Sequence, residues 1–186
     1  MNSPIPHDSP LVPLAEDHAV ALTKLVAVDQ AASAIVACGT SSDTLAVLAD
    51  FRAFLDGPIT RHFQQEEIAL FPPLEAVIGA QGGPTAVMRH EHQELYAAFD
   101  EWRRLAAEAA RAPVGSTPAS ASELQRVSRQ IGSYLGQHIH KEDNVLLPMC
   151  HRFLPAATLA EVGERMQAVP LPQPSPTEPS HQSNKE

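Results

Sequence analysis

The chain has 186 residues, 44% of them hydrophobic and 5% aromatic, which is enough for one domain with a substantial core. Alanine is prominent among the apolar residues and runs of strand-favouring residues are missing, so the composition favours a helical fold. The formal net charge of -9 argues against a nucleic-acid partner or an anionic membrane, because no basic stretch is present to neutralise phosphates.

The first segment, residues 1–13, contains four prolines and predicts an extended N-terminal arm. It lacks the charged and then apolar regions of a secretory signal. No run in the sequence approaches the ~20 apolar residues needed to cross a bilayer. We therefore expect no membrane association and a cytoplasmic location.

Apolar residues at helical spacing predict a first helix that begins at Leu14, has Leu22 on its inward face and ends before Gly39. A second helix follows and stops at the prolines of 72–73. The Gly-Pro pair at 57–58 interrupts it, so we expect a kink or a break there.

A third helix is predicted to open at Pro84, after a glycine pair. The loop 113–121, rich in Ser, Pro and Gly, separates it from a fourth helix. That helix has Val145 on its inward face and ends at Pro148. A shorter fifth helix is expected at about 157–168.

Four helices of roughly 25 residues joined by short loops pack most simply as an up-down-up-down bundle. The predicted fold class is therefore an all-α, up-down-up-down four-helix bundle with a short fifth C-terminal helix. We expect this bundle to occupy residues 14–168. The Pro- and Ser-rich tail at 169–186 is expected to be disordered.

Polar residues interrupt the apolar stripes at positions where the helical pattern demands apolar side chains. They are His18, His62, Glu66, His92, His138 and Glu142. In the alternating topology all of them fall in one slab roughly 10 Å from the same end of the bundle. Burying carboxylates without a cation is costly, so the pattern predicts a single metal site. Imidazole and carboxylate suit iron, manganese or zinc.

Helix phase separates these residues from other histidines nearby. His90 and His140 each lie two residues from a candidate ligand, hence about 200° away around the helix, and are predicted to face solvent. The remaining titratable residues considered are expected to lie outside the slab or beside it without touching metal. They are His7, His151, His181, Glu67 and Glu91.

With these residues placed, the chain resembles the hemerythrin-like, HHE cation-binding family over roughly residues 11 to 168. The matching segments are residues 16–18, 62–67 running into 70–72, 90–92, and 138–142 running into 146–148. The resemblance implies two iron ions in an oxo- or hydroxo-bridged di-iron centre. It further implies that Glu66 and Glu142 bridge the ions, with terminal ligands at His18, His62, His92 and His138.

One departure from the family pattern bears on function. Hemerythrins place two histidines, four residues apart, on the third helix, whereas here His92 has Met88 on one side and Tyr96 on the other. This argues against simple reversible dioxygen storage. Tyr96 and Tyr134 each lie four residues from a predicted histidine ligand, which makes them candidates for contact with the cofactor, as a phenolate ligand or a donor to a bound oxygen species. The alternative is ordinary core packing.

The residues and the resemblance together indicate a non-haem di-iron protein that binds or senses O2, NO or H2O2. The alternative is a di-iron redox enzyme that turns over peroxide or nitric oxide, in a catalase-like, peroxidase-like or NO-reducing reaction. Binding or sensing is favoured slightly, because no separate substrate-recognition motif is visible. We expect a sensor to act through a protein partner or as a homodimer, since no effector domain is evident.

Overall fold

The structure is a computed structural model that describes residues 5–172, and every regular element in this range is a helix. The first half contains α1 (Val12–Cys38), α2 (Ser42–Asp56), α3 (Pro58–Gln65), the π-helix η1 (Glu66–Leu70) and α4 (Phe71–Ile78). The second half contains α5 (Pro84–Arg111), α6 (Ala121–Lys141), the π-helix η2 (Glu142–Leu146) and α7 (Leu147–Phe153), and α8 (Ala156–Ala168) follows. The predicted tail lies mostly outside the described residues.

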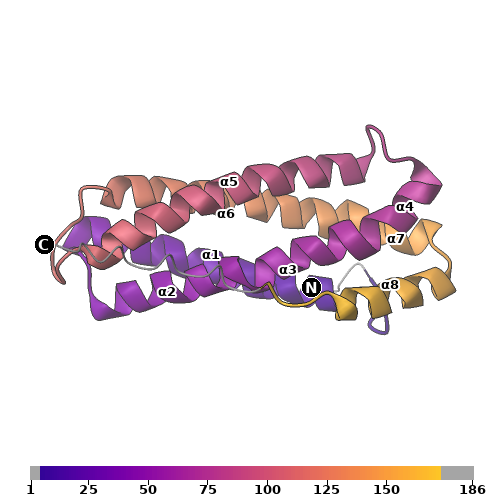
Figure 1. The fold of residues 1–186 in the computed structure, drawn as a ribbon, viewed down its shortest axis with the longest axis horizontal. Helices are drawn as coiled ribbons and strands as arrows, with labels where there is room; N and C mark the ends of the chain where they lie inside the picture. The colour runs from indigo at the N-terminus through magenta and orange to yellow at the C-terminus, as the bar shows by residue number, and fades with distance from the viewer. Residues whose placement is uncertain (1–4, 173–186) are drawn as a thin grey trace, which may run out of the picture.

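The helices form an elongated bundle whose neighbouring rods run in opposite directions (Figure 1). The turns from α1 to α2 and from α5 to α6 lie at one end, and the turn from α4 to α5 lies at the other. Helix α1 packs against α2 and α6, and α5 packs against the same two helices, so α1 and α5 are diagonal. This arrangement confirms the predicted up-down-up-down bundle with a short C-terminal helix.

The Gly57–Pro58 pair divides the second rod, as the sequence predicts. Helix α2 ends at Asp56, and α3 begins with Pro58 in its first turn. Backbone N–H groups in a first turn have no acceptor within the helix, so the N–H that proline lacks costs no hydrogen bond there. The hydroxyl of Thr60 donates to the carbonyl of Leu55 at 2.7 Å, which satisfies a backbone acceptor that the break leaves open. The rod therefore continues beyond Gly57 with a bend and no loop.

The buried interior consists of two apolar clusters with a polar layer between them. The larger cluster fills the middle of the bundle and the end with the α1–α2 turn, and includes Trp102 and Phe51. The smaller one lies under α4, α7 and α8 and includes Phe71 and Leu147. Each of the four long rods crosses from one cluster to the other, and the predicted polar residues occupy the crossing points.

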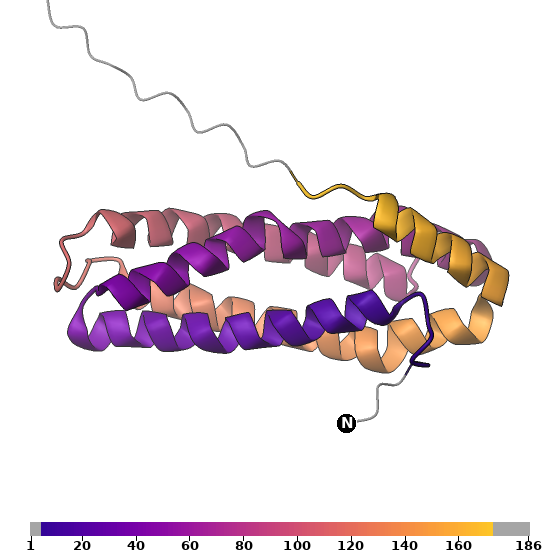
Figure 2. The same cartoon turned by 90° about the horizontal axis from the view of Figure 1, so that it is seen from below.

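Helix α8 and the N-terminal segment cover the end of the bundle beside this polar layer (Figure 2). Ile5 and Leu11 are buried in the smaller cluster. Gly163 of α8 lies so close to Pro10 that an added Cβ would come within 2.7 Å of the proline side chain, so glycine permits this contact. Gln65 donates to the carbonyl of Met166 at 2.9 Å, which ties α8 to the rod below it.

Helix α1 alone among the described helices is long and apolar enough to cross a membrane by length and composition, with a mean hydropathy of 1.5. In the structure it is a bundle helix that packs along α6 and α2. Its inward side carries Leu14, Leu25 and Ile35 into the core, together with His18. The apolar character of α1 is therefore explained in part by its place in the bundle.

Candidate metal centre

The structure brings all six predicted polar residues together in the layer between the apolar clusters, each almost fully buried. Helix α1 contributes His18, α3 His62, η1 Glu66, α5 His92, α6 His138 and η2 Glu142. Both glutamates are the first residues of π-helices, at the points where α3 and α6 change their hydrogen-bonding pattern. Every rod of the bundle therefore supplies at least one of these side chains.

A first group of donor atoms comes from Glu66, His92, His138 and Glu142, whose closest atoms all lie within 4.8 Å of one another. The Nε2 atom of His92 is 3.3 Å from Glu66 Oε2. The Nε2 atom of His138 is 2.9 Å from Glu142 Oε1, and the two Nε2 atoms are 3.1 Å apart. Two imidazoles and two carboxylates thus converge on one point.

A second group comes from His18, His62 and Glu142. The Nε2 atom of His18 is 2.8 Å from Glu142 Oε2 and 3.2 Å from the Nε2 atom of His62. Glu66 Oε2 also lies 3.8 Å from His62 Nε2. Glu142 therefore belongs to both groups through its two oxygens, and Glu66 is within reach of both.

The carboxylates in this layer have no ordinary explanation as core residues. Within residues 5–172, no hydrogen bond of acceptable geometry reaches any of the four oxygens of Glu66 and Glu142, although imidazole nitrogens lie close to them. A buried carboxylate without a partner is strongly unfavourable, and the usual ways to stabilise it are hydrogen bonds, a paired charge or a metal ion. The donor set fits a borderline divalent or trivalent cation such as iron, manganese or zinc.

An acidic side chain stands behind each of the four histidines, on the Nδ1 side of the ring. The pairs are His18 with Asp143 at 2.8 Å, His62 with Asp17 at 3.3 Å, His92 with Glu67 at 2.7 Å and His138 with Glu91 at 3.0 Å. A carboxylate can only accept, so Nδ1 carries the proton and donates it. In the neutral ring, Nε2 then carries the lone pair and directs it at the centre, which is the orientation that a metal ligand needs.

The electrostatics of the cluster favour added positive charge. Burial alone would lower the pKa of His18, yet the nearby carboxylates of Asp143 and Glu142 outweigh it and raise the pKa to about 9. Burial is likewise outweighed at His62, where Glu66 and Asp17 raise the pKa to about 10, and at His92, where Glu66 and Glu67 raise it to about 9. The carboxylates therefore attract positive charge, which protons or a metal ion can supply.

The same forces shift the pKa values of the two buried carboxylates in opposite directions. Burial and repulsion from Glu142 raise the pKa of Glu66. At Glu142 burial acts in the same upward direction, but the contacts with His138, His18 and His62 outweigh it and hold the pKa well below its usual value. Glu142 is accordingly the carboxylate that stays ionised at the centre of the cluster.

The π-helices explain how the chain places acidic residues on both sides of the histidines. An i→i+5 turn inserts one extra residue into the helix, and such segments are often found at functional sites. In η1 the extra residue lets Glu66 point into the cluster while Glu67 reaches His92. In η2, likewise, Glu142 points into the cluster beside His138 while Asp143 reaches His18.

The predicted tyrosines lie differently from one another. Tyr96 is partly buried and packs edge-on against Phe63, a ring that stacks on His92 at a centroid distance of 4.0 Å. Burial and the nearby Glu67 raise the pKa of Tyr96 to about 12, which disfavours a free phenolate. Tyr134 is 45% exposed and lines a surface hollow, so the structure does not bring it into the cluster.

The histidines predicted to face solvent do so. His90 and His140 are exposed, with 70% of the His90 side chain accessible. His7 is exposed, His151 lies 2.9 Å from the hydroxyl of Ser9 away from the cluster, and His181 lies outside the described residues. Sequence reasoning placed Glu67 and Glu91 beside the site but overlooked Asp17 and Asp143, although each directly adjoins a candidate ligand in the sequence.

The family model described as the Hemerythrin HHE cation binding domain matches residues 10–150. This range includes all four rods of the bundle and the six clustered side chains. The chain belongs to the hemerythrin HHE cation-binding family.

Two curated relatives share the same name. Iron-sulfur cluster repair protein YtfE from Dickeya chrysanthemi (strain Ech1591) is 30% identical over 106 residues, which are 56% of this chain and 47% of that protein. Iron-sulfur cluster repair protein YtfE from Musicola paradisiaca (strain Ech703) is 32% identical over 99 residues, 50% of this chain and 42% of that protein. The chain spans about half the length of the curated relatives it matches.

Proposed function

We propose that this protein holds two iron ions and binds or senses a small diatomic or peroxide ligand, O2, NO or H2O2. The observation that carries the proposal is the pair of buried carboxylates without hydrogen-bond partners, surrounded by imidazole Nε2 atoms. Glu66, His92, His138 and Glu142 would hold one ion, and His18 and His62 with Glu142 the other. Iron, when bound, supplies one-electron redox chemistry and affinity for small oxygen- and nitrogen-containing ligands.

The unequal donor groups support a ligand-binding role. The first group offers four protein donors, whereas the second offers three within the same distance. On α5, the positions four residues before and after His92 are occupied by Met88 and Tyr96, so the further histidine of the family pattern is missing there. Each ion would therefore have part of its coordination left for a molecule from outside, at His18 and His62 because that donor group is smaller, and at His92 and His138 because the further histidine is missing.

The surroundings restrict that molecule to a small one. Ile59, Leu95 and Phe99 are buried beside the polar layer, and the cluster residues themselves have almost no exposed surface. A closely packed interior of this kind admits diatomic molecules and peroxide through side-chain motion but excludes larger substrates. This is the reason for preferring O2, NO and H2O2 over organic substrates.

Stopped-flow mixing of the reduced, iron-loaded protein with each of these ligands tests the proposal. We expect the visible spectrum of the protein to change after mixing with at least one of O2, NO and H2O2. A His92→Ala variant that has lost metal should show no such change. Continuous consumption of peroxide or nitric oxide over many turnovers would favour a redox enzyme instead. No reaction with any of the three, in protein shown to hold two irons, would contradict a small-ligand role.

A second candidate function is the repair of iron–sulfur clusters, which the names of both relatives favour. The matched stretches cover 56% and 50% of this chain. The test is whether the iron-loaded protein restores activity to a purified [4Fe–4S] dehydratase damaged by peroxide, with the His92→Ala variant as control. Equal recovery with wild type and control would count against repair by this centre.

A further inference from the structure

The four acidic side chains behind the histidines differ in their own partners. Glu91, which bonds Nδ1 of His138 through one oxygen, is bonded through the other to the ammonium of Lys141. Glu67, behind His92, has the guanidinium of Arg89 at 3.9 Å, but Arg89 lies nearer to Glu75, at 3.3 Å. Within residues 5–172, no lysine or arginine lies within ion-pair distance of Asp17 or Asp143. Only the His138 partner has a direct lysine contact.

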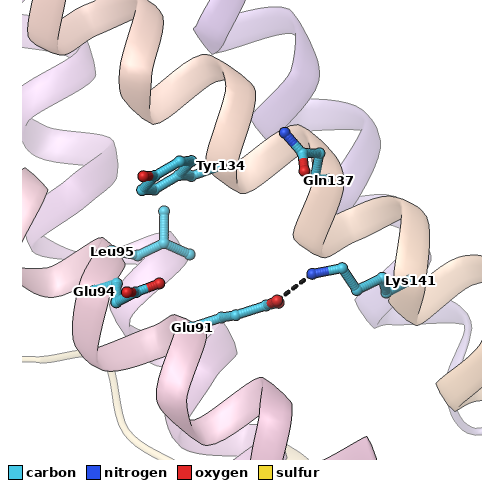
Figure 3. Close-up of a pocket in the computed structure, with 6 residues that line it drawn as sticks. All are labelled: Glu91, Glu94, Leu95, Tyr134, Gln137 and Lys141. Carbon is cyan, nitrogen blue, oxygen red and sulfur yellow. Dashed lines mark hydrogen bonds and ion pairs between the residues drawn. The ribbon is translucent and has the colours of Figure 1, made fainter.

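The Lys141–Glu91 pair lies on the wall of a hollow of about 230 Å3 between α5 and α6 (Figure 3). Glu91, Glu94 and Leu95 reach it from α5, and Tyr134, Gln137 and Lys141 from α6. Glu91 is 19% exposed and Lys141 41%. The lysine charge therefore sits at the bundle surface, one carboxylate and one imidazole away from the donor atoms.

Glu91 lies between Lys141 and His138 and links the lysine charge to the imidazole. Glu91 accepts from Nδ1 of His138 with one oxygen and from the ammonium of Lys141 with the other, which is the bonding pattern of a carboxylate anion. An anion on Nδ1–H strengthens the electron donation of an imidazole through its other nitrogen. A cation bonded to that anion withdraws part of this donation, and its own field also opposes extra positive charge at the centre.

We propose that Lys141 is a positioning residue that raises the reduction potential of the metal ion held by His138, acting through Glu91. The proposal rests on the proposed di-iron function. The step it concerns is a one-electron reduction of ferric to ferrous iron by an added reductant such as dithionite, in which no protein bond forms or breaks. Ferric iron carries one more positive charge than ferrous iron, so Lys141 disfavours the ferric form.

The test is a redox titration of iron-loaded protein, followed by visible and electron paramagnetic resonance spectra, with iron content measured for each variant. Lys141→Met should lower one of the two reduction potentials by about 59 mV, which corresponds to a roughly ten-fold change in a one-electron redox equilibrium. Lys141→Arg keeps the charge and should restore the wild-type value. Lys24→Met, which breaks a comparable surface pair with Asp50 on α1 and α2, is the matched control and should change neither potential.

A double-mutant cycle shows whether Glu91 carries the effect. In a Glu91→Gln background the further change Lys141→Met should shift the potential much less than it does in the wild type. If the Lys141→Met variant retains iron and its potential shifts no more than that of Lys24→Met, the role of Lys141 is overturned while the proposed function stands. A shift unaffected by Glu91→Gln would overturn the route through Glu91. A wild-type protein that binds no iron would overturn the proposed function and this inference together.

Discussion

The two halves of the bundle repeat one motif. In each half a long helix carries an acidic residue followed by histidine, Asp17–His18 on α1 and Glu91–His92 on α5. The returning rod then carries a histidine, a glutamate four residues later and a further acidic residue. It continues through a π-helix into a short α-helix with proline in its first turn. The halves also exchange partners, because His18 bonds Asp143 and His92 bonds Glu67.

The difference between the halves lies in how their glutamates are shared. Glu142 places one oxygen 2.9 Å from His138 and the other 2.8 Å from His18, whereas Glu66 approaches His92 at 3.3 Å and His62 only at 3.8 Å. Repeated sequence motifs therefore do not yield equivalent positions. The second half contributes the carboxylate that both donor groups share.

The largest expected effect follows from this sharing. Glu142→Gln keeps the size of the side chain but removes its charge, and we expect affinity to fall at least ten-fold at both metal positions. Glu66→Gln should weaken mainly the position at His92 and His138, so about one ion per chain remains. Iron titration with elemental analysis measures both. Equal loss in the two variants would show that the carboxylates are shared alike.

The next effect separates ligands from exposed neighbours on α5. His92→Ala should lower metal affinity at least ten-fold, whereas His90→Ala should leave it unchanged, because His90 points to solvent. The pair His138→Ala and His140→Ala repeats the comparison on α6. Metal binding measured by calorimetry distinguishes the outcomes. Similar losses for His90→Ala and His92→Ala would mean that the inward face of α5 is misassigned.

Much of this architecture could be predicted from the sequence, because polar residues on an apolar stripe are conspicuous at helical spacing. The bundle and the six polar residues in its interior were predicted in this way. Helix α1 was harder, since it is apolar on most sides: Leu22 was predicted to face inward but is 45% exposed, while Ala21 is buried. Periodicity gives little direction when few positions are polar.

The π-helices were the other feature that periodicity could not reveal. Val145 was predicted on the inward face of the fourth helix, yet it is 48% exposed and Leu146 is buried instead. The extra residue in η2 moves every later side chain around the axis relative to a regular α-helix. That shift also turns Asp143 towards His18, which is why the acidic residues behind the histidines were incompletely predicted.

A smaller effect is expected from these outer acidic residues. Asp143→Asn keeps the shape but weakens the bond to His18 Nδ1, so we expect metal affinity at the His18–His62 position to fall about ten-fold. Asp17→Asn should cost less, because its contact with His62 is longer, 3.3 Å against 2.8 Å, and more exposed. Competition with a chelator ranks the two variants. The reverse ranking would contradict this assignment.

The smallest effect concerns the tyrosines. Tyr96→Phe should alter the visible spectrum of the oxidised protein slightly, by changing the packing on Phe63 beside His92. Tyr134→Phe should leave the spectrum unchanged, because Tyr134 lies on the bundle surface. Loss of an intense visible band in either variant would indicate direct phenolate coordination and would require a rearrangement of that side chain.

The central claim is that this layer of the bundle holds two iron ions, and anomalous X-ray diffraction at the iron edge tests it most directly. Crystals of the iron-loaded protein should show two peaks. One should lie among Glu66, His92, His138 and Glu142, and the other beside His18, His62 and Glu142. A single peak, or iron bound only outside the layer between the two apolar clusters, would contradict this account.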